Sequence, residues 1–310
     1  MAGAAAALSA VALGSAALAT LTPTRMVWGA LARMLDAITP LILALALVFA
    51  LLTLALGARK LGGLLVAASL IASAALYASY RAVTLPLVPD EEPALSVLFF
   101  NVEGRNRDSA PAILSAAMQS GADVLVFAEA SALLADVDRL RDAYDFVSPC
   151  VIGSCELLIA TNRPVTRHWQ LRLNPVWSER YAVTEIETIT GAPLFLVANH
   201  LAKPWLSGIA EPELNLVRAQ YDWFDAPVVA LGDYNMVPWT RPMRELLQET
   251  EFRAVRGQFA TWPTATLPIG LPIDQVVVHG GPRIVSMGPF GTDLNSNHIG
   301  FVAEIALPAP

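Results

Sequence analysis

The first 80 residues restrict most strongly what this chain can fold into, because they are almost entirely apolar. Three apolar stretches follow one another, at residues 4–21, 38–57 and 61–80. A helix of roughly 20 apolar residues spans a bilayer, with about 17 as a lower limit. A signal peptide is the alternative for the first stretch, but it lacks a basic leading segment. Buried helices of a soluble protein are the alternative for the other two, but these are apolar on every side. We therefore predict a membrane region over residues 1–82 with about three transmembrane helices, two being the main alternative.

The remainder of the chain has ordinary polar content and reads as one mixed domain. Residues 83–94 are rich in proline and acid, which predicts a linker that tethers the domain to the membrane region. Apolar runs typical of strands lie at 95–102, 123–127, 156–161, 181–190, 193–199, 228–231, 273–279, 283–287 and 301–307. Helical patterns lie between them, at 109–119, 131–143, 211–224 and 241–249. This order predicts an α/β or α+β domain over residues 95–310, with sheets covered by helices.

The charge balance argues against extended binding to duplex DNA. The chain has 20 basic and 27 acidic side chains, and a net charge of −7. Five basic residues and one acid precede residue 85, so the remainder holds 15 basic and 26 acidic side chains, with Lys203 as its only lysine. Proteins that grip a nucleic-acid backbone usually present a basic face, because neutralising phosphates supplies much of the affinity.

Polar residues stand at the ends of several predicted strands. In "VVALGDYN", Asp233 and Asn235 follow an apolar run and are two residues apart, so in an extended chain they point to the same side. A strand-end turn is the alternative reading of this stretch. Other predicted strands, however, also have a carboxylate, amide or imidazole side chain at one end. Burying such groups costs several kcal/mol unless they are paired or bind a metal. The repetition predicts one convergent site at a sheet edge, built from Asn101, Glu129, His200, Asp233, Asn235, Asp274 and His298.

The ordered set of these motifs resembles the endonuclease/exonuclease/phosphatase superfamily, which has the deoxyribonuclease I-like fold. The motifs are Asn101, "VLVFAEA" with Glu129, "FLVANHL" with His200, "GDYN" at 232–235, "PIDQVVV" at 272–278 and "SNH" at 296–298. The preceding helices and "TWP" at 261–263 resemble its membrane-anchored bacterial branch. The resemblance covers roughly residues 95–307 and implies two β-sheets flanked by helices.

The resemblance also implies a role for each site residue. Glu129 would be the main ligand of a divalent metal, Mg²⁺ or alternatively Mn²⁺, with Asn101 beside it. Asp233 would activate the attacking water, and Asn235 would hold the phosphate or that aspartate. His200 would donate to a phosphate oxygen, and His298, oriented by Asp274, would form the acid/base pair.

Some of these residues have structural alternatives, and two positions depart from the family pattern. His200 can be a core histidine, Asp274 a turn residue, Glu129 a helix cap and His298 a surface-loop residue. For Trp205, Trp239 and Trp262 we favour burial over a place in a binding cleft. Asn297 stands where the family usually has aspartate, and Gln275 where an aromatic residue or histidine is frequent. Asn297 is the third expected metal contact, and because an amide keeps the shape of a carboxylate but loses its charge, this contact would lack a negative charge.

The combined reading is a membrane-anchored, metal-dependent phosphoesterase that cleaves a phosphodiester or phosphomonoester by direct attack of water. A catalytically degenerate binding module and a nuclease acting on DNA or RNA are the alternatives. The expected partners are the lipid bilayer and a phosphate ester, small or lipid-linked in preference to nucleic acid, with no protein partner evident.

The expected location is the inner (plasma) membrane, with several spans. Arg59 and Lys60 fall on one side, and Arg25, Arg33 and Arg81 on the other, which slightly favours a cytoplasmic domain. Cys150 and Cys155 are reduced thiols in a cytosol or a disulfide in an oxidising compartment. The resemblance and the chance to oxidise these cysteines lead us to predict an extracytoplasmic domain.

Overall fold

Four helices begin the chain in the computed structural model, which describes residues 1–22, 28–150 and 154–308. They are α1 (Ala2–Leu21), α2 (Gly29–Ala37), α3 (Thr39–Ala55) and α4 (Arg59–Ala82). Both α1 and α4 are long and apolar enough to cross a membrane, and they match the spans predicted at 4–21 and 61–80. The span predicted at 38–57 corresponds to α3, which has 17 residues and meets α2 at a bend of 75°. A third span is therefore obtained only when α2 and α3 are counted together.

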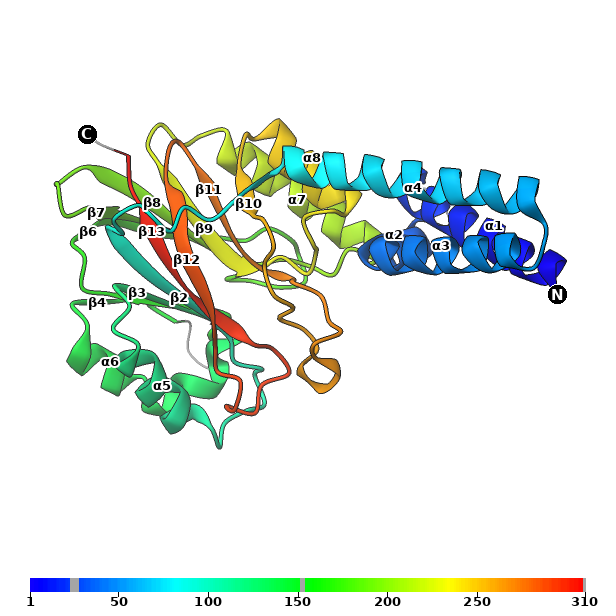
Figure 1. The fold of residues 1–310 in the computed structure, drawn as a ribbon. Helices are drawn as coiled ribbons and strands as arrows, with labels where there is room; N and C mark the ends of the chain where they lie inside the picture. The colour runs from blue at the N-terminus through cyan, green and yellow to red at the C-terminus, as the bar shows by residue number, and fades with distance from the viewer. Residues whose placement is uncertain (23–27, 151–153, 309–310) are drawn as a thin grey trace.

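The helices α1, α3 and α4 form a bundle that projects from one end of the molecule, with the N-terminus at its far tip (Figure 1). Small residues let the backbones approach, since Ala6 of α1 packs with Ala50 of α3 and Leu65 of α4. The Ser9 hydroxyl donates to the carbonyl of Ala46, 2.9 Å away, across the interface between α1 and α3.

Of the basic residues used to predict topology, Arg25 lies outside the described residues.

The rest of the chain forms two mixed sheets that face one another, as the fold prediction required. The first sheet has the order β1-β10-β11-β9-β8-β7-β6, and the second the order β12-β13-β2-β3-β5-β4. The strands of the first are β1 (Thr84–Leu85), β10 (Arg253–Val255), β11 (Asp274–His279), β9 (Val228–Asp233), β8 (Pro193–His200), β7 (Tyr181–Glu187) and β6 (Val165–Leu171). Those of the second are β12 (Arg283–Phe290), β13 (Gly300–Ala306), β2 (Leu95–Asn101), β3 (Val124–Ala128), β5 (Leu157–Thr161) and β4 (Phe146–Val147).

The core lies between the sheets, and helices cover their outer faces (Figure 1). Val97, Val126, Val229 and Val276 belong to one buried cluster that joins both sheets. Strands β3 and β9 are buried at every residue, which explains why they read as continuous apolar runs. The second sheet is covered by α5 (Ala110–Gln119), the 3₁₀ helix η1 (Ala130–Asp136) and α6 (Asp138–Ala143), and the first by α7 (Ser207–Tyr221) and α8 (Arg241–Glu249). The predicted fold class is confirmed.

The segment 83–94 differs from its prediction as a free linker. Its residues Thr84–Leu85 form β1, which pairs in parallel with β10 at the edge of the first sheet. Further along, the backbone N–H of Val88 donates to the carbonyl of Ile284 over 3.0 Å, and Glu91 pairs with Arg283 at 2.7 Å. The prolines exclude a helix, but they leave enough N–H groups for the segment to pair along strand edges. The N-terminal helices are therefore joined to the domain by a packed segment.

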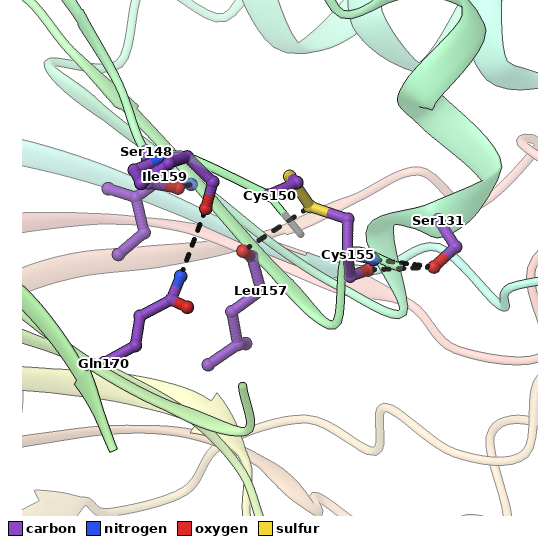
Figure 2. Close-up of a disulfide and its surroundings, with 8 residues drawn as sticks. Ser131, Ser148, Cys150, Cys155, Leu157, Ile159 and Gln170 are labelled. Atoms are coloured by element: carbon purple, nitrogen blue, oxygen red, sulfur yellow. Dashed lines mark hydrogen bonds between the residues drawn. A yellow bond between two sulfur atoms is a disulfide. The ribbon is translucent and has the colours of Figure 1, made fainter. Parts of the chain in front are cut away.

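Cys150 and Cys155 form a disulfide beside the helix that follows β3 (Figure 2). The backbone N–H of Cys155 donates to the Ser131 hydroxyl over 3.0 Å, and that hydroxyl donates to the Cys155 carbonyl over 3.2 Å. Cys155 is fully buried and directly precedes Glu156 and β5. Of the two states that the sequence left open, the structure has the disulfide.

Candidate active site

Strand directions bring the predicted site residues to one end of the sandwich. Strands β8 and β9 are parallel and place His200 opposite Asp233. Strand β11 is antiparallel to β9, so its first residue, Asp274, also lies opposite Asp233. In the second sheet, β2 and β3 are parallel, which brings Asn101 beside the end of β3, where Glu129 follows. Residues distant in the sequence therefore meet at one sheet edge, as the repeated strand-end motif predicted.

Asp233 is the hub of this cluster, and its side chain is almost fully buried. Its Oδ2 atom accepts a hydrogen bond from Nδ2 of Asn101 at 3.1 Å. The same oxygen lies 3.8 Å from Nε2 of His200 and 3.9 Å from Nε2 of His298. Its Oδ1 atom accepts the backbone N–H of Asn235 over 2.8 Å. One carboxylate thus faces an amide and two imidazoles, an arrangement suited to handling a proton.

The surroundings of Asp233 raise its pKa. Burial is the largest cause, and the charge of Asp274 adds to it, while the positive charges of His298 and His200 act in the opposite direction. A carboxylate with a raised pKa is a stronger base than an exposed aspartate. It is therefore better able to take a proton from water.

His298 and Asp274, which were predicted to form the acid/base pair, are in hydrogen-bond contact. Nδ1 of His298 lies 2.9 Å from Oδ2 and 3.2 Å from Oδ1 of Asp274, and both side chains are buried. Burial lowers the pKa of His298, but the charge and hydrogen bond of Asp274, with the charges of Asp233 and Glu129, raise it to about 9. His298 therefore holds its proton near neutral pH and can donate it from Nε2.

His200 is held by a residue that the sequence analysis missed. Its Nδ1 lies 3.2 Å from Oε2 of Glu156, and the Nε of Arg180 lies 3.3 Å from the same oxygen. Burial raises the pKa of Glu156, but the hydrogen bond to His200 and the charge of Arg180 outweigh it and lower the pKa. Glu156 was assigned only to the start of a strand, and its position directly after Cys155 is the one local signal for a special role.

Glu129 and Asn235 both have left-handed backbones, with φ of 51° and 50°. Non-glycine residues adopt this conformation rarely, in turns and at functional sites. Oε2 of Glu129 accepts the N–H of Gly104 over 3.0 Å, and Oε1 lies 3.4 Å from Nδ2 of Asn101. Nδ2 of Asn235 donates to the carbonyl of Leu201 over 2.9 Å, next to His200. The helix-cap alternative for Glu129 is not supported, because its side chain makes no capping hydrogen bond to η1.

Two groups of residues are candidates for holding a divalent metal. Asp233, Asp274 and His298 offer ligand atoms within 4.8 Å of one another. A protonated His298, however, has no free lone pair on its ring, and its positive charge already offsets one of the two carboxylates. The half-buried carboxylate of Glu129 is an oxygen donor that lines a cavity with Asn297, and it suits a hard cation such as Mg²⁺ that keeps most of its waters.

The other two predicted metal ligands contribute less directly. Asn101 turns its amide nitrogen toward Glu129 and Asp233, while its Oδ1 accepts the backbone N–H of Glu103 over 3.0 Å. Asn297 is exposed, and its backbone N–H donates to Oε2 of Glu103 over 3.1 Å. Of the predicted ligands, Glu129 is the one that offers a charged oxygen to a cation.

The site opens into a cavity of about 310 Å³. Its polar wall holds Glu129, His200, Asp233, Asn235, Asn297 and His298. Trp205 and Trp262 also line it, although we favoured burial over a place in a binding cleft for these two residues. Trp239 does pack, edge-on against Tyr80 of α4.

Gly232 allows the close approach of β8 and β9 directly before Asp233. A Cβ atom at this position would lie 2.0 Å from the carbonyl oxygen of Asn199, which is backbone and cannot turn away. Any side chain at position 232 would therefore separate His200 from Asp233. This explains the glycine of the "GDYN" motif.

We expect Gly232→Ala to lower the free energy of unfolding by about 3 kcal/mol, as overpacking of a buried site does. Gly288→Ala is the matched control, because Gly288 also lies in a strand but has open space where a Cβ would stand. Thermal unfolding of both variants measures the difference. Equal midpoints for the two would contradict the steric role of Gly232.

Comparisons with known proteins agree with this architecture. The profile of the Endonuclease/Exonuclease/phosphatase family matches residues 98–298. A humanized zebrafish (D. rerio) TDP2 superimposes with a TM-score of 0.54 at 16% identity, over 68% of this chain and 98% of that one. The human nocturnin catalytic domain with a bound sulfate anion gives a TM-score of 0.53 at 14% identity, over 72% of this chain and 97% of that one. A Beutenbergia cavernae endonuclease/exonuclease/phosphatase gives a TM-score of 0.52 at 15% identity, over 70% of this chain and 72% of that one.

No curated protein matches the chain by sequence. The identities to the solved structures are low, so those likenesses concern the fold alone. The family profile, in contrast, covers more than half of the chain and includes every predicted site residue from Asn101 to His298. The chain belongs to the endonuclease/exonuclease/phosphatase family.

Proposed function

We propose that this protein is a membrane-anchored, divalent-metal-dependent hydrolase that cleaves a phosphate ester by direct attack of water. The observation that carries the proposal is the convergence on Asp233, whose Oδ2 faces Asn101, His200 and His298 at 3.1, 3.8 and 3.9 Å. Members of this family are usually hydrolases of phosphate esters, which supports the reaction class. The site keeps the polar residues of the family motifs, and this argues against a degenerate binding module; they are Glu129, Asp233, Asn235, Asp274 and His298.

In the proposed reaction, Asp233 takes a proton from water, and the water oxygen forms the new bond to phosphorus. The bond from phosphorus to the leaving oxygen breaks, and His298 supplies the proton that this oxygen requires. His200 donates to a phosphate oxygen and stabilises the negative charge that develops there. Glu129 would hold a divalent cation, which neutralises charge on the phosphate when bound. The products are a phosphate and an alcohol, with one water consumed.

The charge of the domain favours a small or lipid-linked phosphate ester over nucleic acid. The chain after residue 84 carries a net charge of −11 in formal terms, with 26 acidic and 15 basic side chains. Binding a long polyanion to such a surface would gain little from counterion release. A single phosphate group needs only the local positive charges of the site.

The disulfide supports an extracytoplasmic domain. Disulfides persist in oxidising compartments and are rare in the cytosol. With three spans, the N-terminus and the domain lie on opposite sides of the membrane. Thiol labelling of the native protein, with and without reductant, tests this location. Labelling of Cys150 and Cys155 without reductant would contradict it.

A hydrolysis panel on the full chain in detergent tests the proposed reaction. The full chain is required, because β1 and residues 83–94 are packed against the domain. The panel contains a synthetic phosphodiester, a phosphomonoester, phospholipid vesicles, phosphorylated inositols and DNA, each with Mg²⁺ or Mn²⁺ and with a chelator. Metal-dependent release of product from a phosphate ester is expected. Binding without turnover across the panel would support the degenerate module.

Glu129→Gln should raise the Mg²⁺ concentration needed for half-maximal activity by about 100-fold. Loss of an outer partner of a ligand costs 10–100-fold in metal affinity, and loss of a ligand charge should cost at least as much. Glu92→Gln is the control, since Glu92 is exposed in the segment before β2. Metal titrations of both variants by rate and by isothermal calorimetry measure the effect. An unchanged Mg²⁺ requirement in Glu129→Gln would remove Glu129 from the metal site.

A further inference from the structure

The short helix α2 is fixed to the catalytic segment that begins at Asp233. Oδ2 of Asp36 accepts the backbone N–H of Arg241, the first residue of α8, over 2.7 Å. Nε1 of Trp239 donates to the carbonyl of Ala37 over 2.9 Å. Arg33 pairs with Asp36 at 3.5 Å and donates to the carbonyl of Thr22 over 2.6 Å. Helix α2 is thus held on one side by the end of the first membrane-span candidate and on the other by the catalytic domain.

The opposite face of α2 is apolar and exposed. Trp28, Leu31, Met34 and Ile38 are spaced by three or four residues, so they form one stripe along the helix. Their exposed fractions are 63%, 46%, 52% and 39%. A helix on a soluble domain normally turns such a stripe inward. Here the charged residues point inward, which is typical of a helix that lies at a membrane surface.

The same stripe enters the active-site cavity. Met34 and Ile38 are both exposed members of the stripe and lining residues of the cavity of about 310 Å³. The apolar lining continues from them with Ala37, Met236, Val237, Leu271, Ile273, Trp205 and Trp262. The polar wall with Asp233 and His298 faces this lining. Two apolar residues of the exposed α2 stripe therefore line the same cavity as the reacting groups, beside the cations of Arg33 and Lys203.

We propose that this α2 stripe is the entrance wall for the alkyl chain of a lipid-linked phosphate ester. The inference rests on the proposed hydrolase function and names its substrate class. The phosphate would occupy the site at Asp233, and the alkyl chain would lie along Ile38 and Met34 toward the bilayer. The position of α2 between α1 and α3 places this entrance at the end of the bundle that meets the domain (Figure 1). Met34 and Ile38 are specificity-determining residues in this arrangement.

The test compares two substrates that differ only in chain length. Ethyl p-nitrophenyl phosphate and hexadecyl p-nitrophenyl phosphate share the scissile bond, and both release p-nitrophenol on attack by water. With the full chain in mixed micelles, the hexadecyl ester should have the higher kcat/KM, by about tenfold or more, as apolar contacts in a pocket provide. The double variant Met34→Ser/Ile38→Ser should lose this preference, so that its kcat/KM for the hexadecyl ester falls to its kcat/KM for the ethyl ester.

Two further variants separate this effect from damage to the fold or the micelle surface. Met34→Leu/Ile38→Leu should keep the preference, because it retains the apolar stripe. Ile189→Ser/Trp223→Ser changes two exposed apolar residues at the opposite end of β8 and β9 and should change neither rate. Equal kcat/KM for the two esters in wild type would overturn the proposal that the α2 stripe binds an alkyl chain. The proposed hydrolase function would still stand. Hydrolysis of neither ester would overturn the proposed function itself, and this inference with it.

Discussion

Asp233→Asn should reduce kcat by about 10³-fold, in the middle of the range that general acid–base catalysis contributes. Asparagine keeps the hydrogen bond that the Asn235 N–H donates to Oδ1 over 2.8 Å, so the turn after β9 should survive. It cannot take a proton from water, however. Because we place the metal on Glu129, the Mg²⁺ affinity should change far less than the rate. Single-turnover kinetics with a synthetic phosphodiester, alongside metal calorimetry, separate the two quantities.

The control for this variant is Asp225→Asn, which changes an exposed aspartate just before β9. It removes the same charge from the chain without touching the site, so its kcat should equal that of wild type. If Asp233→Asn retained more than about a tenth of the wild-type rate, Asp233 could not be the base. If it lost metal binding as well as turnover, the cluster of Asp233, Asp274 and His298 would be the metal site instead.

The arrangement of the site was predictable because it depends on strand ends. Apolar runs fix where the strands lie, and a polar residue at the end of each run must find a partner. The strands β8, β9 and β11 then place His200, Asp233 and Asp274 at one edge. Local periodicity and the cost of burial were enough to select these residues. Their hydrogen-bond partners were not predictable in the same way.

What the sequence analysis missed consists of contacts between segments with no shared local pattern. Glu156 holds His200 from 44 residues away, and in "SCELL" only its place after Cys155 distinguishes it from an exposed glutamate. The bond from Asp36 to Arg241 joins positions 205 residues apart and helps to hold α2 beside the active-site cavity. A proline-rich, acidic segment reads as a tether, although pairing of Thr84–Leu85 with β10 requires only a free strand edge. Such contacts depend on tertiary geometry, which composition and spacing do not contain.

Asp274→Asn should move the whole pH profile of kcat/KM to lower pH. Burial alone lowers the pKa of His298, and it is mainly Asp274 that raises the value to about 9. Without the Asp274 charge, His298 loses its proton at lower pH, and the alkaline limb of the profile moves down. The same charge raises the pKa of Asp233, so its removal lets Asp233 lose its proton at lower pH, and the acid limb also moves down. A bell-shaped profile that shifts, rather than one that merely narrows, is the expected result.

The size of the loss in Asp274→Asn should therefore depend on where it is measured. If the pKa of His298 falls by about two units, its protonated fraction at pH 8 falls by about tenfold. At pH 6, His298 stays mostly protonated in both the wild type and the variant. Profiles from pH 5 to 10 at saturating Mg²⁺ measure the shift, with the exposed Asp293→Asn as the control that should leave both limbs in place. A uniform loss at every pH would mean that Asp274 only orients the imidazole. An alkaline limb that stays near pH 9 would show that Asp233 and Glu129 are enough to keep His298 protonated. Asp274 would then not be the group that sets the pKa of His298.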